Sequence, residues 1–400
     1  AYPVFPTTNL STFTGGVSAT NSAVIFGPNA MPASGDFNLG EASYIGDAYT
    51  DPNDNHITNV SDFIARFPTS TAQGMIGFDY FGSGQVSAVV TDPIDLSRFT
   101  GPVYLGTASM ARLDAGITIT TTNGGNDPYR VAADKGGDLE VAATLTGDRG
   151  VIIGDPNSPP TFGDYLRGEP SKVRLTADNS YTGGTTLYAG KLFVSQTTEG
   201  AATTALGTGP LTVNPFTFPS IITETFGDST SAHDDNGSPA PELASDSETL
   251  TIANPIVLNT ELGLAGGQNI ELSGPISGSG SLYVENGTTL NLAHEINTFA
   301  GGVYLEGYSN LNVMTDQAFG TGPLAFGDYG GGTVDFYSSN PVIGGLSGGN
   351  SNTYNYLETE LANTTLTINQ ASDSSFSGYI ESGYYTQSES QSDSYSLRLI

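Results

Sequence analysis

Carboxylates and amides are the side chains of this chain best able to do chemistry, and one segment gathers several of them. Asp51, Asn53, Asn55, Asn59 and Asp62 stand at positions 1, 3, 5, 9 and 12 of a twelve-residue loop. An EF-hand loop supplies oxygen ligands to Ca²⁺ from these positions. His56 replaces the usual turn glycine, and Asp62 replaces the usual Glu. The segment therefore predicts either a Ca²⁺ loop or an Asx-rich turn, and no other cofactor is expected.

The remaining reactive side chains do not form a recognisable catalytic group. The 41 acidic residues would permit a glycosidase-like carboxylate pair, but no spacing singles one out. His56, His233 and His294 lack a metal-ligand spacing. We find no phosphate loop, nucleophile elbow or dinucleotide motif. The chain is therefore expected not to be an enzyme, and a polysaccharide-active enzyme remains the catalytic alternative.

Tyrosines near the C-terminus offer a different kind of chemistry. Tyr379, Tyr384 and Tyr385 would suit a sugar-binding platform or an adhesive patch. A tyrosine on a strand is equally compatible with half-buried packing. Both interpretations stay open at this stage.

Charge excludes several classes of partner. The formal net charge is −30, and no Lys or Arg lies between Lys191 and Arg398. Nucleic acid and anionic membrane surfaces are therefore not expected as partners. No apolar run approaches the roughly 20 residues of a membrane span. The acidic surface is explained equally by solubility and by ion binding. Without cysteine, the chain has no disulfides, which fits a secreted protein or one at a bacterial cell surface.

An internal repeat shows which elements must position these side chains. Residues 179–194 and 297–313 align with one insertion, and Gly-Thr-Gly-Pro-Leu follows each of them. A third copy of the opening lies at Thr12–Val17. Alternating apolar residues predict strands with one buried face, and Gly-Gly pairs predict corners. The matched apolar residues are Leu187, Leu192 and Val194 in one copy and Leu305, Leu311 and Val313 in the other.

Short strands with glycine corners and no helical crossovers predict stacked coils. We therefore expect an all-β fold of the parallel β-helix or β-solenoid type. A β-sandwich array is the alternative architecture.

The repeat resembles the autotransporter-associated β-strand repeat, also called the passenger-associated transport repeat, of bacterial surface proteins. The hallmark is N-x-Y-x-G-G-T-x-x-x-x-G-x-L-x-V followed by A-L-G-x-G. Residues 179–194 with 205–209 match it closely, and residues 297–313 with 318–322 match it with substitutions such as Phe299 for Tyr. The resemblance implies a right-handed parallel β-helix displayed at the bacterial surface, with no enzymatic activity. No C-terminal membrane barrel is recognised, so self-secretion is not implied.

The chain is expected to divide into two regions. Residues 1–126 form a β-rich segment that is either a cap or the first coils, with a short helix predicted at Val60 to Phe67. Residues 127–400 form the repeat solenoid, with loop insertions at 154–171 and 214–247.

The chain ends suggest self-association. An open terminal coil exposes unpaired backbone, so the first and last half-coils could complete each other between molecules. The alternative is a fragment of a longer array. The expected function is a self-assembling extracellular structural protein, such as a fibre, sheath or surface layer, whose partner is itself. The second hypothesis is a monomeric adhesin that binds glycan or cells. The residues assigned to assembly are Thr12, Phe13, Gly15, Gly16, Val17, Leu397, Leu399 and Ile400.

Overall fold

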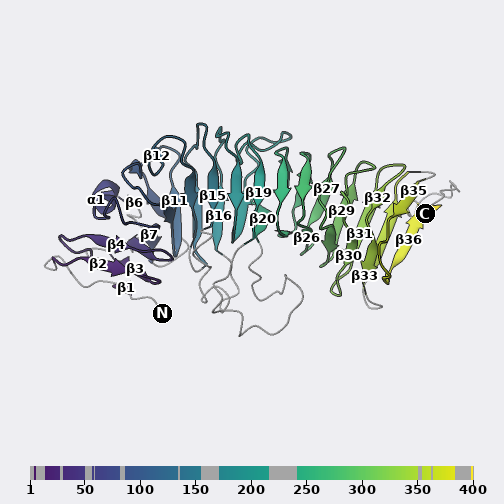
Figure 1. The fold of residues 1–400 in the computed structure, drawn as a ribbon, viewed down its shortest axis with the longest axis horizontal. Coiled ribbons are helices and arrows are strands. Elements are labelled where there is room, and N and C mark those ends of the chain that lie inside the picture. Colours follow the sequence, from purple (N-terminus) through teal and green to yellow (C-terminus); the bar gives the residue numbers. More distant parts are fainter. Residues whose placement is uncertain are drawn as a thin grey trace. The chain divides into compact units, whose positions relative to one another are not determined.

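The computed structural model is nearly all β, with stacked parallel strands that form a β-solenoid of about 13 turns (Figure 1). This confirms the predicted fold class over the β-sandwich alternative. The structure describes residues 4–5, 14–27, 30–49, 56–57, 59–81, 86–133, 136–154, 171–215, 241–349, 354–361, 364–382 and 398–399.

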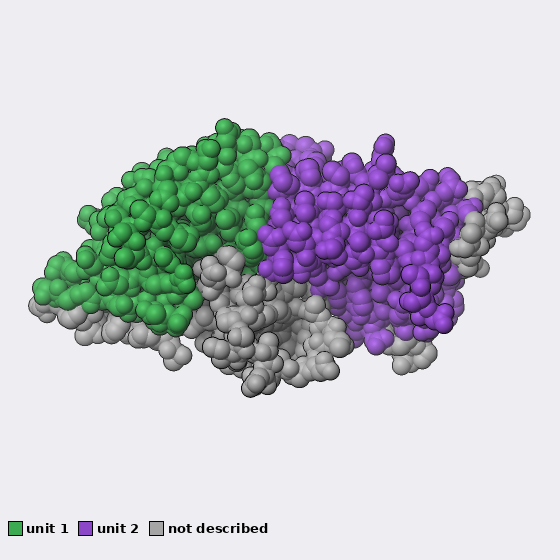
Figure 2. All heavy atoms as spheres, in the orientation of Figure 1, with its two compact units in different colours: residues 1–193, 204–209, 216–240 green, residues 194–203, 210–215, 241–400 purple. Residues whose placement is uncertain are grey.

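The chain divides into two compact units (Figure 2). Unit 1 comprises residues 1–193, 204–209 and 216–240, and unit 2 comprises residues 194–203, 210–215 and 241–400.

In unit 1, two sets of parallel strands run in the orders β1-β3-β5-β7-β10-β13-β15-β17 and β6-β8-β11-β14-β16-β18. The bounds are β1 (Val4–Phe5), β2 (Val17–Ala19), β3 (Ala23–Phe26), β4 (Phe37–Leu39), β5 (Tyr44–Tyr49), β6 (His56–Ile57), α1 (Val60–Ala65), β7 (Gly74–Tyr80), β8 (Ala88–Val90), β9 (Ile94–Asp95), β10 (Val103–Gly106), β11 (Met110–Leu113), β12 (Ile119–Thr120), β13 (Tyr129–Val131), β14 (Asp138–Val141), β15 (Val151–Ile153), β16 (Lys172–Leu175), β17 (Thr185–Leu187) and β18 (Lys191–Val194).

In unit 2, four sets of parallel strands run in the orders β19-β22-β25, β20-β23-β26-β28-β30-β33, β21-β24-β27-β29-β31-β34-β36 and β32-β35-β37. The bounds are β19 (Leu211–Val213), β20 (Glu242–Ser245), β21 (Thr249–Ile252), β22 (Ile256–Leu258), β23 (Leu262–Leu264), β24 (Asn269–Leu272), β25 (Ile276–Gly278), β26 (Leu282–Val284), β27 (Thr289–Leu292), β28 (Val303–Leu305), β29 (Ser309–Val313), β30 (Leu324–Phe326), β31 (Gly332–Phe336), β32 (Val342–Ile343), β33 (Leu346–Gly348), β34 (Asn355–Thr359), β35 (Thr365–Ile368), β36 (Tyr379–Ser382) and β37 (Arg398–Leu399).

The apolar residues that the repeat predicts to face inward are buried in the structure. Leu187, Leu192 and Val194 are buried, as are Leu305, Leu311 and Val313. Their neighbours Phe193, Glu306 and Asn312 are only half-buried. Because parallel neighbours pair in register, each apolar residue stacks on its counterpart one coil away.

The asparagine that opens each of the two repeats forms hydrogen bonds between coils. In unit 1, Asn179 accepts a hydrogen bond from the Leu145 N–H (2.8 Å) and donates one to the Ala205 carbonyl (2.7 Å). In unit 2, Asn297 makes equivalent bonds to the Ile276 N–H (2.8 Å) and the Ala318 carbonyl (2.6 Å). Each asparagine is buried, and it satisfies one backbone group in the preceding coil and one in the following coil.

The aromatic residue and the glycines of the motif also depend on one another. Tyr181 and Phe299 are fully buried. A Cβ on Gly207 would lie 2.8 Å from the Tyr181 ring, and one on Gly320 would lie 2.9 Å from the Phe299 ring. Both glycines have positive φ, 64° and 78°. Only glycine fits there, because any side chain would collide with the aromatic ring and strain the backbone.

The two repeats differ at a coupled pair of positions. In unit 1, the Tyr181 hydroxyl lies 2.5 Å from Thr185 Oγ1, and both side chains are buried. In unit 2, Phe299 and Val303 occupy the matching positions and are also buried. One copy therefore contains a satisfied polar pair where the other contains an apolar pair.

The first coils of unit 1 enclose an aromatic cluster. Phe37 stacks on Phe26 at 5.1 Å and meets Phe67 edge-on at 5.5 Å. Helix α1 adds the buried Phe63 to this cluster. The predicted helix at residues 60–67 is therefore confirmed, although it ends at Ala65.

The strands before residue 126 share sheets with those after it. Leu105 of β10 pairs with Val131 of β13, and β11 pairs with β14 in the same parallel sense. Residues 155–170, within the first predicted insertion, lie outside the described residues. The second predicted insertion, 214–247, extended too far, because Glu242–Ser245 form strand β20 with buried Leu243 and Ala244.

Candidate binding surface on the β21 to β36 sheet

The strands of the sheet β21-β24-β27-β29-β31-β34-β36 in unit 2, several of which are labelled in Figure 1, alternate buried and more exposed residues, so the sheet has one buried face and one outward face. Leu311, Val334 and Leu357 are in register and point into the core. The residues between them form two outward columns. The first contains Thr249, Asn269, Thr289, Asn310, Thr333, Tyr356 and Tyr379, and the second contains Thr251, Glu271, Asn291, Asn312, Asp335, Glu358 and Glu381.

The middle of this face carries an amide ladder. Asn312 Nδ2 donates a hydrogen bond to Asn291 Oδ1 at 2.6 Å, and Asn310 Nδ2 lies 3.5 Å from Thr289 Oγ1. Stacked amides satisfy each other from coil to coil, so this part of the face is occupied by contacts within the chain.

Beyond the amide ladder, the second column becomes acidic. Asp335 lies opposite Glu358, and Glu358 lies opposite Glu381. Burial and the nearby Glu358 and Glu360 raise the pKa of Asp335 to about 7. Burial, Glu381 and Glu360 also raise the pKa of Glu358. Like charges directly opposite each other destabilise a sheet. Positive charge placed beside these carboxylates would therefore reduce the repulsion between them.

Asp335, Glu358 and Glu360 offer carboxylate oxygens that lie within 4.8 Å of one another. This spacing would let three hard oxygen ligands share a divalent cation. All three side chains are only half-buried, and exposed acidic groups are common without an ion. The cluster alone does not identify a metal site.

Three exposed tyrosines stand at the corner that precedes the sheet. Tyr308, Tyr329 and Tyr354 are 70%, 69% and 67% exposed, and they precede β29, β31 and β34 respectively. They belong to successive coils, since the Tyr308 N–H donates to the Gly331 carbonyl and the Gly332 N–H donates to the Tyr354 carbonyl. The Tyr308 and Tyr329 rings are 6.4 Å apart in an edge contact.

Two further tyrosines continue this row onto the outward face. Tyr356 stacks with Tyr354 at 6.5 Å and with Tyr379 at 5.3 Å, with interplanar angles of 3° and 18°. Tyr379 is 53% exposed. We call Tyr308, Tyr329, Tyr354, Tyr356 and Tyr379 the tyrosine stripe. Ring contacts join Tyr308 to Tyr329, and Tyr356 to both Tyr354 and Tyr379. Exposed aromatic surface of this kind is typical of a binding site.

The structure does not test the predicted Ca²⁺ loop. Asp51, Asn53 and Asn55 lie outside the described residues. Asn59 adopts a left-handed conformation before α1 without making a side-chain cap, and Asp62 lies in the first turn of that helix.

The predicted assembly residues are partly placed. Val17 begins β2, which pairs in parallel with β4, and a Cβ on Gly16 would lie 3.0 Å from the Asp36 carbonyl. Gly15 precedes them in a bend. Leu399 is in β37, which pairs with β35. The remaining assembly residues, Thr12, Phe13, Leu397 and Ile400, lie outside the described residues.

Sequence reasoning identified only one member of the stripe, Tyr379. Tyr384 and Tyr385 lie outside the described residues. The other four tyrosines were missed, although a signal exists. Tyr308 and Tyr329 are separated by 21 residues, which is the offset of many coil-to-coil hydrogen bonds in unit 2. Aligning the later coils at that offset would have placed both tyrosines at the same corner.

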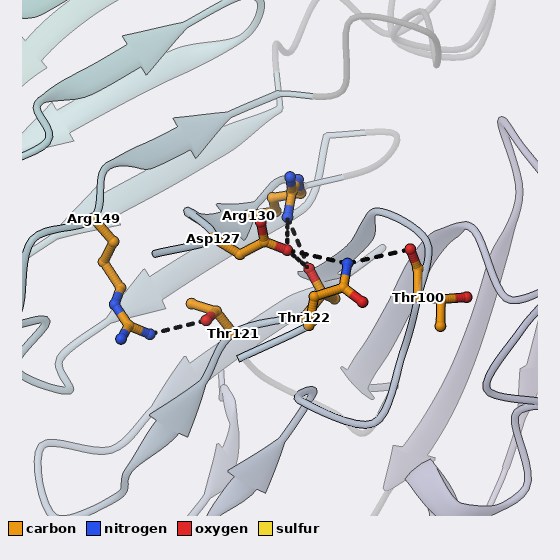
Figure 3. Close-up of polar contacts among 7 residues, drawn as sticks. Thr100, Thr121, Thr122, Asp127, Arg130 and Arg149 are labelled. Atoms are coloured by element: carbon orange, nitrogen blue, oxygen red, sulfur yellow. Dashed lines mark hydrogen bonds and ion pairs between the residues drawn. The ribbon is translucent and has the colours of Figure 1, made fainter. Parts of the chain in front are cut away.

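Unit 1 contains a second polar group, drawn in Figure 3. Arg149 donates a hydrogen bond to Thr121 Oγ1, and Arg130 donates one to Thr122 Oγ1, both at 2.9 Å. Thr122 in turn donates to Asp127 Oδ2 at 3.0 Å. These contacts link neighbouring coils within the chain and contain no nucleophile–base pair. We therefore infer that they stabilise this part of the fold.

Two buried carboxyl groups lie in the first coils of unit 1. Asp79 is fully buried and accepts hydrogen bonds from Tyr44, Thr107, Ser109 and the Ala108 N–H. Burial, together with the nearby Asp79, raises the pKa of Asp47 to about 7. Because hydrogen-bond donors from the same chain already surround the buried Asp79 carboxyl, we interpret the Asp47 and Asp79 carboxyls as structural.

Comparison with known proteins neither supports nor contradicts these interpretations. No family model, curated protein or solved structure matches the chain. The resemblance to the autotransporter-associated repeat therefore stays a prediction from the motif. Within the described parts of the chain, the structure has no helix long and apolar enough to cross a membrane.

Proposed function

We propose that this chain is an extracellular β-solenoid scaffold that binds a polysaccharide along the tyrosine stripe of unit 2. The observation that carries the proposal is the stripe itself: five exposed or half-exposed tyrosines come from four successive coils and contact one another in two groups. An adhesive protein at a bacterial surface would use such a row to hold a long, repetitive ligand.

The chemistry of the stripe suits a sugar chain. A tyrosine ring offers an apolar body for the C–H groups of a sugar and a hydroxyl for its oxygens. Carboxylates beside the rings accept hydrogen bonds from sugar hydroxyls, and charged acceptors make the stronger bonds. The rings stand on a hydrogen-bonded parallel sheet, so little ordering is required when a ligand binds.

The charge of the surface limits the class of glycan. Asp335, Glu358 and Glu381 follow the stripe, and the sequence has no Lys or Arg from residue 192 to residue 397. Acidic polysaccharides would be repelled. Neutral or cationic polysaccharides remain.

A binding screen against immobilised neutral, acidic and amino polysaccharides tests the proposal. The triple variant Tyr308→Ala, Tyr329→Ala and Tyr354→Ala should lose binding at least about tenfold, since buried aromatic anchors dominate interface energies. The matched control is Ile296→Ala with Met314→Ala, which removes other exposed apolar side chains of unit 2. Equal binding by the triple variant and the wild type would reject the proposal.

Head-to-tail self-assembly is the second candidate function. Among the described residues, β36 is the last strand of its sheet and pairs only with β34, while β1 is the first strand of another sheet and pairs only with β3. Edge strands with free backbone groups are templates for pairing with another chain. Electron microscopy of the full chain and of a variant lacking residues 1–17 tests this. Filaments that disappear in the variant would support assembly, and monodisperse particles at all concentrations would exclude it.

A further inference from the structure

The tyrosines and carboxylates of the outward face are paired rung by rung. Tyr356 and Glu358 lie two residues apart on β34, and Tyr379 and Glu381 lie two residues apart on β36. Residues two apart on a strand share a face and are separated by about 7 Å. Parallel pairing aligns the two rungs, so a row of rings and a row of carboxylates run side by side along the coils.

The carboxylate row lacks compensation from basic side chains of its own part of the sequence. No Lys or Arg occurs from residue 192 to residue 397. Burial, and after it the neighbouring carboxylates, raise the pKa of Asp335 and of Glu358. A ligand with positive charges at regular intervals would relieve this repulsion at several rungs together, whereas a neutral ligand would leave it in place.

Tyrosine rings beside carboxylates favour one kind of cation. An ammonium group on a sugar can lie over a tyrosine ring and at the same time donate hydrogen bonds to the neighbouring carboxylate. A small hydrated metal ion would use the carboxylates without the rings. The combination therefore favours an organic amine.

We propose that the ligand of the tyrosine stripe is a cationic amino-sugar polymer whose protonated amines pair with the carboxylates of Asp335, Glu358 and Glu381. This inference rests on the proposed polysaccharide function and specifies its ligand class.

Two hexasaccharides with the same backbone, one with free amines and one with those amines acetylated, test the inference. One is a hexamer of β-1,4-linked glucosamine, and the other is its fully N-acetylated counterpart. We expect the amine form to bind about tenfold more tightly at about pH 7, where Asp335, with its pKa of about 7, is partly ionised before the ligand binds; this ratio corresponds to about 1.4 kcal/mol. Added salt should weaken binding of the amine form and leave the acetylated form nearly unchanged. Titration calorimetry measures both.

A charge-neutralised variant identifies the groups responsible. Asp335→Asn, Glu358→Gln and Glu381→Gln together preserve size while removing charge. In this variant the two hexasaccharides should bind within about twofold of each other. Glu271→Gln is the matched control, because Glu271 lies in the same outward column three strands away. The neutralised variant should unfold at the same or a higher temperature, since a like-charge row is removed, so lost binding would not reflect misfolding.

The outcomes separate the two proposals. Equal affinity of the wild type for both hexasaccharides, with binding lost in the triple tyrosine variant, would overturn the amine inference and preserve the polysaccharide function. A preference for the amine form that persists in the neutralised variant would also overturn the inference. Failure of both hexasaccharides to bind, together with no hit in the wider polysaccharide screen, would overturn the proposed function itself.

Discussion

The buried Tyr181–Thr185 pair of the first repeat supports a double-mutant prediction, because the second repeat already contains its apolar counterpart. Tyr181→Phe removes one partner, and Thr185→Val removes the other. The double variant reproduces Phe299 and Val303 of the second repeat. Each single change should destabilise the first repeat, and the double change should restore most of the loss.

The magnitudes follow from burial. Thr185→Val leaves the Tyr181 hydroxyl in the core without its 2.5 Å partner, and an unsatisfied buried polar group costs about 1 to 3 kcal/mol. Tyr181→Phe should cost less, about 1 kcal/mol, because Thr185 Oγ1 is also 3.4 Å from the Leu206 carbonyl. Replacing both partners with apolar groups should be nearly neutral, within about 0.5 kcal/mol of the wild type. The coupling free energy between the two sites is then about 1.5 to 4.5 kcal/mol.

Native-state hydrogen exchange is the appropriate assay, because a repeat array does not unfold as one two-state unit. The reporters are the amides of β17, which contains Thr185. The reciprocal experiment changes Phe299→Tyr and Val303→Thr in unit 2, where Phe299→Tyr alone should reduce protection. Additive effects of the two single changes in either repeat would refute the reasoning, since the pair would then not act as a unit.

Three further predictions concern individual residues. Because the pKa of Asp47 is raised to about 7, the folded chain holds more protons than the unfolded chain between about pH 4 and 7, so stability should fall as pH rises through this range, by up to about 4 kcal/mol. Thermal unfolding at about pH 5 and 8 should show this loss, and Asp47→Asn should reduce it, leaving the part that Asp335 contributes through its own raised pKa. Asn297→Ala leaves the Ile276 N–H and the Ala318 carbonyl without their partner and should reduce the local stability by about 2 to 4 kcal/mol, measured by exchange of the β25 amides; unchanged protection would contradict the bridging role. Gly207→Ala should destabilise by about 1 to 3 kcal/mol, measured by denaturant unfolding, because it strains the backbone and crowds the Tyr181 ring; Gly200→Ala, where a Cβ meets no atom within 4 Å, is the control for the effect of positive φ alone.

The coil architecture could be predicted because the repeat motif encodes contacts within and between adjacent coils. The positions of Asn179, Tyr181 and Gly207 all serve backbone and core contacts that recur in the second copy. Each position is constrained by sterics or hydrogen bonding, so its residue type is visible in the sequence. Strand β20 was missed because its four residues follow a Pro- and Ser-rich stretch that reads as loop.

The tyrosine stripe could not be predicted with the same certainty because exposure depends on how coils align. Tyr181 is fully buried, whereas Tyr354 is 67% exposed, although both lie beside short strands. The distance along the sequence from Tyr308 to Tyr329 is 21 residues, and from Tyr329 to Tyr354 it is 25. The strands that follow these tyrosines pair at an offset of 23 residues in both steps, so Tyr329 lies two residues out of step with Tyr308 and Tyr354, and the tyrosine spacing alone hides the alignment. The carboxylate row has the same origin, since Asp335 and Glu358 meet only through inter-coil pairing.

The bridging asparagines have a consequence for how such a chain changes length. Asn179 and Asn297 bond only to backbone groups, the N–H and carbonyl of neighbouring segments. Backbone groups are the same whatever residue supplies them, so a bridge of this kind places little demand on the identity of its neighbours. A duplicated coil would bring its own asparagine and find its acceptor and donor ready in the adjacent coils. At this contact, whole coils could therefore be gained or lost by gene duplication or deletion without compensating substitutions, so the number of rungs can vary separately from the sequence of each rung.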